Sequence, residues 1–195
     1  MDAIVTLKIT LNGIKPPIWR RLEVPASYHL GELHQALNVA MGWLDYHLHA
    51  FEIDGRTYGV PGVGLFPEDD DTLPEENIVL GDLPRVGIKR FEYHYDFGDD
   101  WCCSVAIEKI GPAEEGVFYP RCAAGRRAAP PEDCGGLPGF AEFKDAMADP
   151  RHPEHGELKT WYGGDFDPEA FSAAGASKLL RQVATGEMPD EWQRA

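Results

Sequence analysis

The chain opens with two runs of alternating apolar and polar residues. In residues 4–12 apolar side chains recur at every second position with polar ones between them, which is typical of a strand with one buried face. The break Asn-Gly-Ile-Lys-Pro-Pro follows, and alternation resumes over residues 18–24. Two such runs joined by a turn predict an antiparallel hairpin, and therefore a sheet that buries one of its faces.

An amphipathic helix is predicted after this hairpin. Its apolar residues follow the i, i+3, i+4, i+7 spacing and stop before Gly42: Leu33, Ala36, Leu37, Ala40 and Met41. Further alternation predicts strands at residues 47–53, 90–97 and 101–110. Helical spacing predicts three later helices, at residues 139–148, 153–162 and 168–185. This order predicts an α+β fold, in which a β-grasp-like mixed sheet packs on one amphipathic helix and additional helices follow over about 139–185.

A single domain covering residues 1–195 is expected from the length and from a hydrophobic content of 43%. Residues 59–77 are rich in glycine, proline and acid, including three aspartates at 69–71, and are predicted to be a solvated acidic loop. Residues 111–138 are expected to be irregular for the same reason.

The charge balance limits the partners. Eighteen Lys and Arg residues face 33 Asp and Glu residues, giving a formal net charge of −15. Such a field repels phosphate backbones, so we expect no binding to duplex DNA. No signal peptide and no apolar run long enough to span a membrane are found in the sequence, and the four cysteines contain no C-x-x-C pair. We expect a soluble, cytoplasmic protein with free thiols and no membrane partner.

The most unusual segment is YHYDFGDDWCCSV at residues 93–105. Alternation over residues 92–97 assigns the side chains to two faces: Tyr93, Tyr95 and Phe97 on one, Glu92, His94 and Asp96 on the other. Glycine and two aspartates then favour a turn over residues 96–101. On one interpretation Asp96, Asp99 and Asp100 are oxygen ligands for a hard cation such as Mg²⁺. On the other, the acids bond turn amides and the aromatic residues build the core.

Two histidines provide a second candidate for metal binding. His47 and His49 are two residues apart on a predicted strand, so both point to one face and are able to occupy two corners of a zinc or iron site. The alternative is a pair of partly buried histidines bonded to backbone or carboxylates. Cys102 and Cys103 point to opposite faces of a strand, so they do not bind one metal together.

A rigid loop is predicted at residues 119–136. The diproline at 130–131 stiffens it, and the glycine pair at 135–136 permits a sharp reversal. This combination presents two acids in a fixed pose, with two arginines available to pair with them or with an anion: Glu132, Asp133, Arg126 and Arg127. The alternative is an Ω-like loop held to the sheet by internal ion pairs.

We predict that the 96–101 turn and the 126–136 loop lie side by side and form one acidic, aromatic-walled cleft near Trp101. Clustered carboxylates raise one another's pKa unless a cation offsets them. We favour an arginine for this role, with a divalent cation as the alternative. The candidate cleft comprises Asp96, Asp99, Asp100, Trp101, Arg126, Arg127, Glu132 and Asp133.

Five segments occur in a recognisable order: KPPIWRRLEV, ELHQALNVAMGWLDYHLHAFEI, YHYDFGDDW, YPRCAAGRRAAPPEDCGG and ADPRHPEHGELKTWYGGDFDPEAF. In order and spacing they resemble the plasmid pRiA4b ORF-3-like family, which is also labelled a "TnpR family" of transposon passenger proteins. The resemblance covers about residues 3–185. It implies a compact α+β fold and a bacterial or archaeal origin, and it supplies no reaction.

Two positions depart from that family's pattern. Many relatives have a histidine where this chain has Cys103, and a cysteine where it has Ala129. A metal site built on those positions is weakened here, although Cys103 is able to replace histidine as a ligand. The sequence contains no recognisable recombinase catalytic block, so the resolvase label is not carried over as an activity.

Two functions are therefore expected from the sequence. The favoured one is a non-catalytic module that binds a small ligand or a protein and needs no cofactor. The alternative is a metal-assisted hydrolase that uses carboxylates from the 96–100 turn and the 130–136 loop, with a divalent metal and His47, His49 or Cys103 as further metal ligands. Whether the protein is an enzyme stays open.

Overall fold

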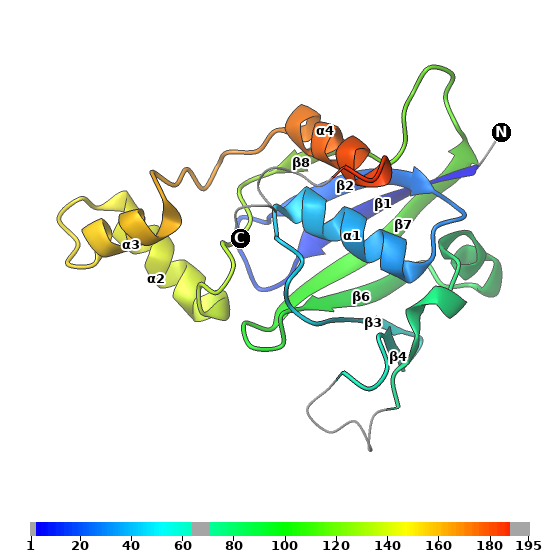
Figure 1. The fold of residues 1–195 in the computed structure, drawn as a ribbon, viewed down its shortest axis with the longest axis horizontal. Coiled ribbons are helices and arrows are strands. Elements are labelled where there is room, and N and C mark those ends of the chain that lie inside the picture. The colour runs from blue at the N-terminus through cyan, green and yellow to red at the C-terminus, as the bar shows by residue number, and fades with distance from the viewer. Residues whose placement is uncertain (1–2, 64–70, 188–195) are drawn as a thin grey trace.

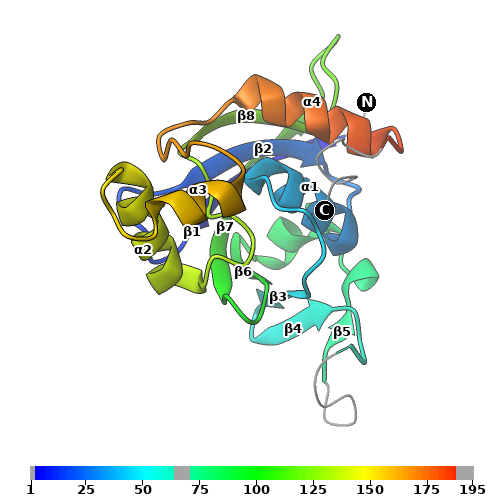
Figure 2. The same cartoon turned by 60° about the vertical axis from the view of Figure 1, so that its left-hand side comes forward.

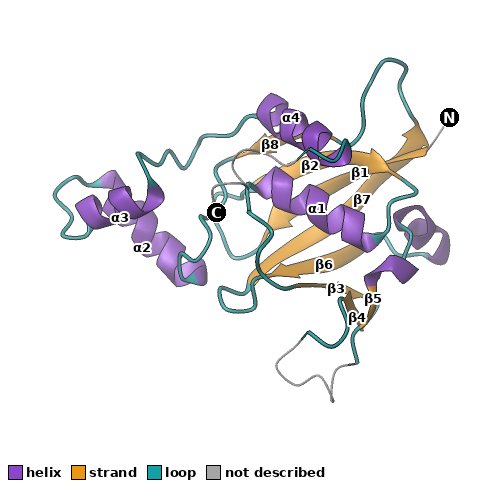
Figure 3. Ribbon diagram, viewed as in Figure 1, coloured by secondary structure: helices purple, strands orange, loops and turns teal. Residues whose placement is uncertain are grey.

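The computed structural model describes residues 3–63 and 71–187. Its centre is an eight-stranded sheet in the order β5-β4-β3-β6-β7-β1-β2-β8 (Figures 1 and 3). The strands are β1 (Ala3–Leu11), β2 (Trp19–Pro25), β3 (His49–Ile53), β4 (Arg56–Gly59), β5 (Leu73–Pro74), β6 (Arg90–Tyr95), β7 (Trp101–Pro112) and β8 (Arg121–Arg126). Neighbouring strands run antiparallel except β4 and β5, so the sheet is mixed and the predicted α+β class is confirmed.

The predicted N-terminal hairpin forms the middle of the sheet. β1 and β2 pair antiparallel, with Leu7 opposite Leu22 and Val5 opposite Val24. These four side chains are fully buried, because alternation places every second residue of both strands on the inner face. β7 lies on the other side of β1, so the two predicted strands at 90–110 belong to the same sheet as the hairpin.

Helix α1 (Leu30–Met41) covers the inner face of this sheet, and α4 (Ala173–Ala184) lies beside it over β8 (Figures 1 and 2). The side chain of Glu32 accepts a hydrogen bond of 3.0 Å from the backbone N–H of His29, which closes a capping box at the start of α1. Gly42 ends the helix in the left-handed conformation. The apolar stripe of α1 is buried, including Leu33 and Leu37.

Helices α2 (Gly136–Ala148) and α3 (His155–Tyr162) form a separate pair beyond the end of the sheet (Figure 1). Phe140 of α2 meets Trp101 edge-on, with 6.5 Å between ring centroids. Phe143 makes a similar contact with Trp161 of α3 at 5.8 Å. Aromatic packing therefore joins this helical pair to the end of β7.

Two sequence predictions on loop segments need correction. The acidic loop at 59–77 contains β5 and a short 3₁₀ helix, η2 (Glu75–Asn77), while residues 64–70, with two of the three aspartates, lie outside the described residues. Residues 111–138 are not irregular throughout, because β8 adds the edge strand there. A further 3₁₀ helix, η3 (Leu80–Val86), precedes β6.

The last helix begins later than predicted. Ser172 caps α4 by accepting a 3.0 Å hydrogen bond from the backbone N–H of Gly175. The carboxylate of Asp167 accepts a hydrogen bond from the backbone N–H of Glu169 within a turn, and residues 168–172 are not helical. None of the described helices is long and apolar enough to cross a membrane.

Candidate functional site

Three loop segments meet at one end of the sheet: residues 43–48 after α1, the 96–100 turn after β6, and the 130–136 loop after β8. The backbone N–H of Asp96 donates to the carbonyl of Leu48 at 2.9 Å, which joins the first two segments. The indole N–H of Trp43 donates to the carbonyl of Pro130 at 3.2 Å, which joins the first and third. The site is therefore assembled from parts of the chain that are far apart in sequence.

The turn and the loop lie side by side, as predicted. The carboxylate Oδ2 of Asp99 accepts a 3.1 Å hydrogen bond from the backbone N–H of Gly135. The next residue, Gly136, has a φ of +65°, and a Cβ atom there would lie 2.6 Å from the carbonyl oxygen of Asp99. Only glycine fits this close approach of two backbones.

His47 lies at the centre of a group of carboxylates. Its Nε2 atom is 3.3 Å from Asp133 Oδ1, 3.6 Å from Asp96 Oδ2 and 3.8 Å from Glu132 Oε2. We call these four residues the His47 site. Asp96 and Glu132 have side chains only 9% and 7% exposed, whereas Asp133 is 61% exposed at the outer edge.

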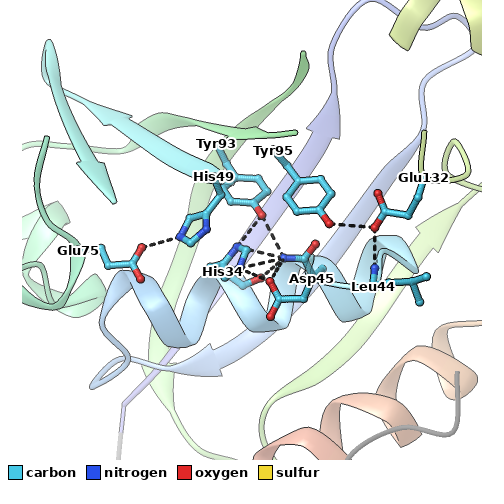
Figure 4. Close-up of polar contacts among 9 residues, drawn as sticks. His34, Leu44, Asp45, His49, Glu75, Tyr93, Tyr95 and Glu132 are labelled. Atoms are coloured by element: carbon cyan, nitrogen blue, oxygen red, sulfur yellow. Dashed lines mark hydrogen bonds and ion pairs between the residues drawn. The ribbon is translucent and has the colours of Figure 1, made fainter. Parts of the chain in front are cut away.

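One oxygen of each buried carboxylate is held by hydrogen bonds. Asp96 Oδ1 accepts from the backbone N–H of Gly98 at 3.0 Å. Glu132 Oε1 accepts from the backbone N–H of Leu44 at 2.7 Å and from the hydroxyl of Tyr95 at 2.9 Å (Figure 4). These bonds fix the two carboxylates so that their second oxygens, Asp96 Oδ2 and Glu132 Oε2, face His47.

The atoms that face one another have few hydrogen bonds. Neither His47 Nε2 nor Glu132 Oε2 has a hydrogen-bond partner among the described residues, although both are buried. The distance from His47 to Asp133 is within ion-pair range, but it is not a hydrogen bond. Ligand atoms about 2.1 Å from a tetrahedral metal ion lie about 3.4 Å from one another. The separations of 3.3–3.8 Å around His47 Nε2 match that spacing and are long for hydrogen bonds.

Burial disfavours charge on the deepest carboxylate. It raises the pKa of Glu132 above its ordinary value, despite the hydrogen bonds from Leu44 and Tyr95 and the nearby His47, which lower it. Asp133 raises the pKa further through its negative charge. Within residues 3–63 and 71–187, no lysine or arginine forms an ion pair with the carboxylates of the His47 site. A bound cation would relieve this unfavourable charge.

A cavity of about 300 Å³ opens beside Asp133, between α2 and α3. Its charged lining residues are all acidic, and its apolar wall includes Phe143, Leu158 and Trp161. The most exposed carboxylate of the His47 site therefore lies at a space large enough for a small molecule.

A second polar network lies next to the His47 site, under α1 (Figure 4). His34 bonds through Nε2 to Asp45 at 2.5 Å and through Nδ1 to the hydroxyl of Tyr93 at 2.8 Å. Its ring stacks on that of His49, with centroids 3.4 Å apart, and His49 bonds to Glu75 at 2.7 Å. Burial lowers the pKa of His34, although Asp45 acts in the opposite direction.

The structure separates the two histidines that the sequence pairs. His49 forms a hydrogen bond with Glu75 in the second network. This contact matches the alternative prediction, a partly buried histidine bonded to a carboxylate. Cys103 is fully buried, and burial raises its pKa, while the positive charge of Arg20 acts in the opposite direction. Neither residue is part of the His47 site.

The prediction that Arg126 or Arg127 offsets the charge of the clustered carboxylates is wrong. Arg127 pairs with Glu169 at 2.8 Å and donates to the carbonyl of Pro17, because β8 directs it toward the segment before α4. Arg126 is exposed, and its carbonyl accepts a 3.0 Å bond from Arg20. The basic group among the carboxylates is instead His47.

Three residues of the turn also differ from the prediction. Trp101 is fully buried against Phe140, so it supports the site from the core and does not line an open cleft. Asp100 is exposed, and its charge acts on Cys102, on the other face of the sheet. Asp96 lies on the same side as Tyr95, because β6 ends at Tyr95 and the φ of +56° at Asp96 breaks the alternation.

The sequence did not indicate the groups that hold Glu132 in the His47 site and His49 in the second network. Tyr95 and the backbone N–H of Leu44 hold Glu132, and Glu75 holds His49. Tyr95 was assigned to the core face, where its hydroxyl had no predicted partner. Glu75 lay in a segment read as solvated loop, so only the structure shows its contact.

Comparison with known proteins agrees with this fold. Residues 3–174 match the family model described as plasmid pRiA4b ORF-3-like protein. The chain is 36% identical over 185 residues to the uncharacterized protein y4hQ of Sinorhizobium fredii, with 93% of each chain covered. It is also similar to the crystal structure of a protein of unknown function, MM3350, from Methanosarcina mazei: the TM-score is 0.78 at 40% identity, covering 89% of this chain and 97% of that one. The chain thus belongs to the plasmid pRiA4b ORF-3-like family.

Proposed function

We propose that the His47 site binds a divalent metal ion and that the protein is a metal-assisted hydrolase. The observation that carries this proposal is the convergence of His47 Nε2, Asp96 Oδ2 and Glu132 Oε2, all within 4.8 Å of one another, around a point where no hydrogen bond joins them. Each carboxylate presents one oxygen to this point and is held by its other oxygen. An imidazole nitrogen with carboxylate oxygens is a donor set that suits Zn²⁺ or Mn²⁺.

His47, Asp96 and Glu132 would hold the ion as three protein ligands and would leave room for a water molecule. Catalytic zinc sites have this composition, with three protein ligands and one water molecule whose pKa the metal lowers. Asp133, exposed at the edge of the cavity, would accept a proton from that water. The metal would supply a water activated for attack on the carbonyl or phosphoryl centre of a substrate in the cavity, and Asp133 would pass the proton to the leaving group.

A non-catalytic ligand-binding module is the second candidate, and the cavity beside Asp133 favours it. The cavity is large enough for a small molecule, and its acidic and aromatic lining suits a ligand with a positive charge. In this case the carboxylates and aromatic rings of the cavity hold the ligand, without any turnover.

Metal binding is tested first, by isothermal titration of chelator-treated protein with Mn²⁺, which prefers oxygen and nitrogen ligands. We expect one ion at the His47 site, and Asp96→Asn should abolish its binding. Asp99→Asn is the matched control, because Asp99 belongs to the same turn but bonds to the backbone N–H of Gly135 and is not one of the carboxylates around His47. Equal affinity in the Asp96 variant and the wild-type protein would refute the metal centre.

Hydrolysis is tested separately on chromogenic carboxylic and phosphate esters, with and without the metal. An activity that requires the metal and is lost in Asp133→Asn, while metal binding persists, supports the hydrolase. Metal binding without turnover of any ester class favours the binding module.

A further inference from the structure

The face of the sheet opposite α1 carries a second group of metal-ligating side chains. Because successive residues of β6 point to opposite faces, Glu92 and His94 lie on the side away from Tyr93 and Tyr95. Cys102 of β7 is paired directly with His94 across the two strands. The three side chains project from adjacent strands in the middle of a rigid sheet, on the face away from the His47 site.

The ligand atoms of Glu92, His94 and Cys102 lie within 4.8 Å of one another. His94 Nε2 is 3.7 Å from Glu92 Oε2, a separation too long for a hydrogen bond. The side chains of His94 and Glu92 are 28% and 47% exposed, and Cys102 is half-buried. A dissolved ion therefore has access to the group, and the sheet still restricts its side chains.

The thiol of Cys102 is oriented by Asn12, the residue that follows β1. The amide Nδ2 of Asn12 donates to the sulfur at 3.2 Å. The amide oxygen of Asn12 in turn accepts a 2.9 Å bond from the hydroxyl of Ser104, which fixes the direction of the amide. A donor aimed at sulfur stabilises a thiolate, and such outer contacts orient the ligands of metal sites in proteins.

The charge around this thiol also favours a cation. Glu92, Asp100 and Glu52 are the charged groups that act on Cys102, and all three raise its pKa. Burial is the largest cause of that rise, and Asn12 counters it. A metal ion offsets the three carboxylates and replaces the thiol proton.

The other cysteines lack this setting. Cys103 and Cys122 are buried and have Arg20 as their nearby charged group. Cys134 lines the cavity beside Asp133, on the side of the His47 site. Among the residues that the structure describes, Cys102 alone combines with a histidine and a carboxylate in a metal-ligating group.

We propose that Glu92, His94 and Cys102 form a second metal site, which takes a thiophilic divalent cation such as Zn²⁺ with water as the fourth ligand. Thiolate, imidazole and carboxylate are the three donor types that zinc uses in proteins. We call this group the Cys102 site. It is independent of the His47 site, which has no sulfur ligand.

Cobalt distinguishes the two sites, because Co²⁺ bound to a thiolate gives an intense charge-transfer band in the near ultraviolet and Co²⁺ bound only to nitrogen and oxygen does not. Chelator-treated, reduced protein is titrated with Co²⁺. We expect the band to grow to saturation in the wild-type protein and to disappear in Cys102→Ser. Cys134→Ser, the matched cysteine control, and Asp96→Asn, which alters only the His47 site, should both retain it.

His94→Gln should weaken Co²⁺ binding, measured by the same band, by about tenfold or more. If circular dichroism shows that Cys102→Ser does not fold, His94→Gln replaces it as the variant that tests the proposal. A wild-type protein that shows no band at saturating Co²⁺, a band that persists in folded Cys102→Ser, or a band lost in Cys134→Ser would each overturn the proposal.

Discussion

Replacing Glu132 by glutamine should stabilise the metal-free protein and remove its stabilisation by metal. Oxygen Oε1 of the side chain is retained, so it continues to accept hydrogen bonds from the backbone N–H of Leu44 and the hydroxyl of Tyr95. The second oxygen, which faces His47 and Asp96 without a hydrogen bond, becomes an amide nitrogen that is able to donate. One buried negative charge disappears at the same time.

The size of the first effect follows from the spacing of the charges. At the 4.8 Å limit for the ligand atoms, two negative charges repel by about 3.5 kcal/mol at an effective dielectric constant of about 20, and by about 0.9 kcal/mol in bulk water. His47 and the raised pKa of Glu132 already relieve part of this repulsion. We therefore expect a gain of about 1 kcal/mol in the free energy of unfolding, or about 2–4 °C in Tm for a chain of this length.

The second effect has the opposite sign. A ligand that binds only the folded protein stabilises it by about 2.7 kcal/mol at one hundred times its Kd. This corresponds to a rise of about 5–11 °C in Tm for the wild-type protein. Since the amide nitrogen of the variant is not a metal ligand, we expect little or no rise in Glu132→Gln. The wild-type protein should be the less stable of the two without metal and the more stable with it.

Differential scanning calorimetry measures both effects, in chelator and then in excess Mn²⁺, which prefers oxygen and nitrogen ligands and therefore does not load the Cys102 site. Glu142→Gln is the matched control, because Glu142 lines the neighbouring cavity but does not face His47, and it should keep the full metal-dependent rise. If Glu132→Gln retains the same metal-dependent rise as the wild-type protein, the reasoning is wrong. A large loss of stability in chelator would show that the Glu132 charge is stabilising and would refute the repulsion argument.

Three further predictions concern the backbone, pH and nucleic acid. In urea unfolding, Gly136→Ala should destabilise the protein by more than Gly163→Ala. Both glycines have positive φ, so the backbone strain of about 1–2 kcal/mol applies to both variants. Only a Cβ atom at position 136 would also lie 2.6 Å from the carbonyl oxygen of Asp99. Burial lowers the pKa of His34 in the folded state. The neutral imidazole therefore contributes its full stability above the unfolded pKa of 6.5, and this contribution is lost as the pH falls below that value. Urea unfolding midpoints should fall less steeply between pH 7.5 and 5 in His34→Gln than in the wild-type protein. At physiological salt we expect no mobility shift of duplex DNA at micromolar protein, because the net charge is −15; sub-micromolar binding would contradict this.

Local sequence patterns predicted most of the strands and helices, and missed those that depend on distant contacts. The period-two alternation of β1 and β2 is strong and places Leu7 opposite Leu22 in the core. The strand β8 reads RCAAGR, with little alternation, and its pairing with β2 is supported by a hydrogen bond from the Arg20 side chain to the carbonyl of Arg126. Because this partner lies over 100 positions away, no local pattern indicates the strand.

The members of the His47 site were all identified from the sequence, but in separate hypotheses. Asp96 was singled out as part of a turn, Glu132 and Asp133 as part of a rigid loop, and His47 as half of a histidine pair. Their convergence depends on hydrogen bonds between segments, such as that from Asp96 to the carbonyl of Leu48. These bonds involve backbone groups, which are the same at every position and leave no signal in the sequence.

The arginine prediction failed for a reason that strengthens the case for a metal ion. Proximity in sequence suggested that Arg127 would compensate Glu132 and Asp133, but the chain directs Arg127 to Glu169. His47 is then the basic group that the described structure places among the carboxylates. An imidazole carries at most one positive charge, and the carboxylates together carry up to three negative charges when ionised. Protein groups alone leave this excess uncompensated, whereas a divalent cation together with the same four side chains brings the site close to neutrality.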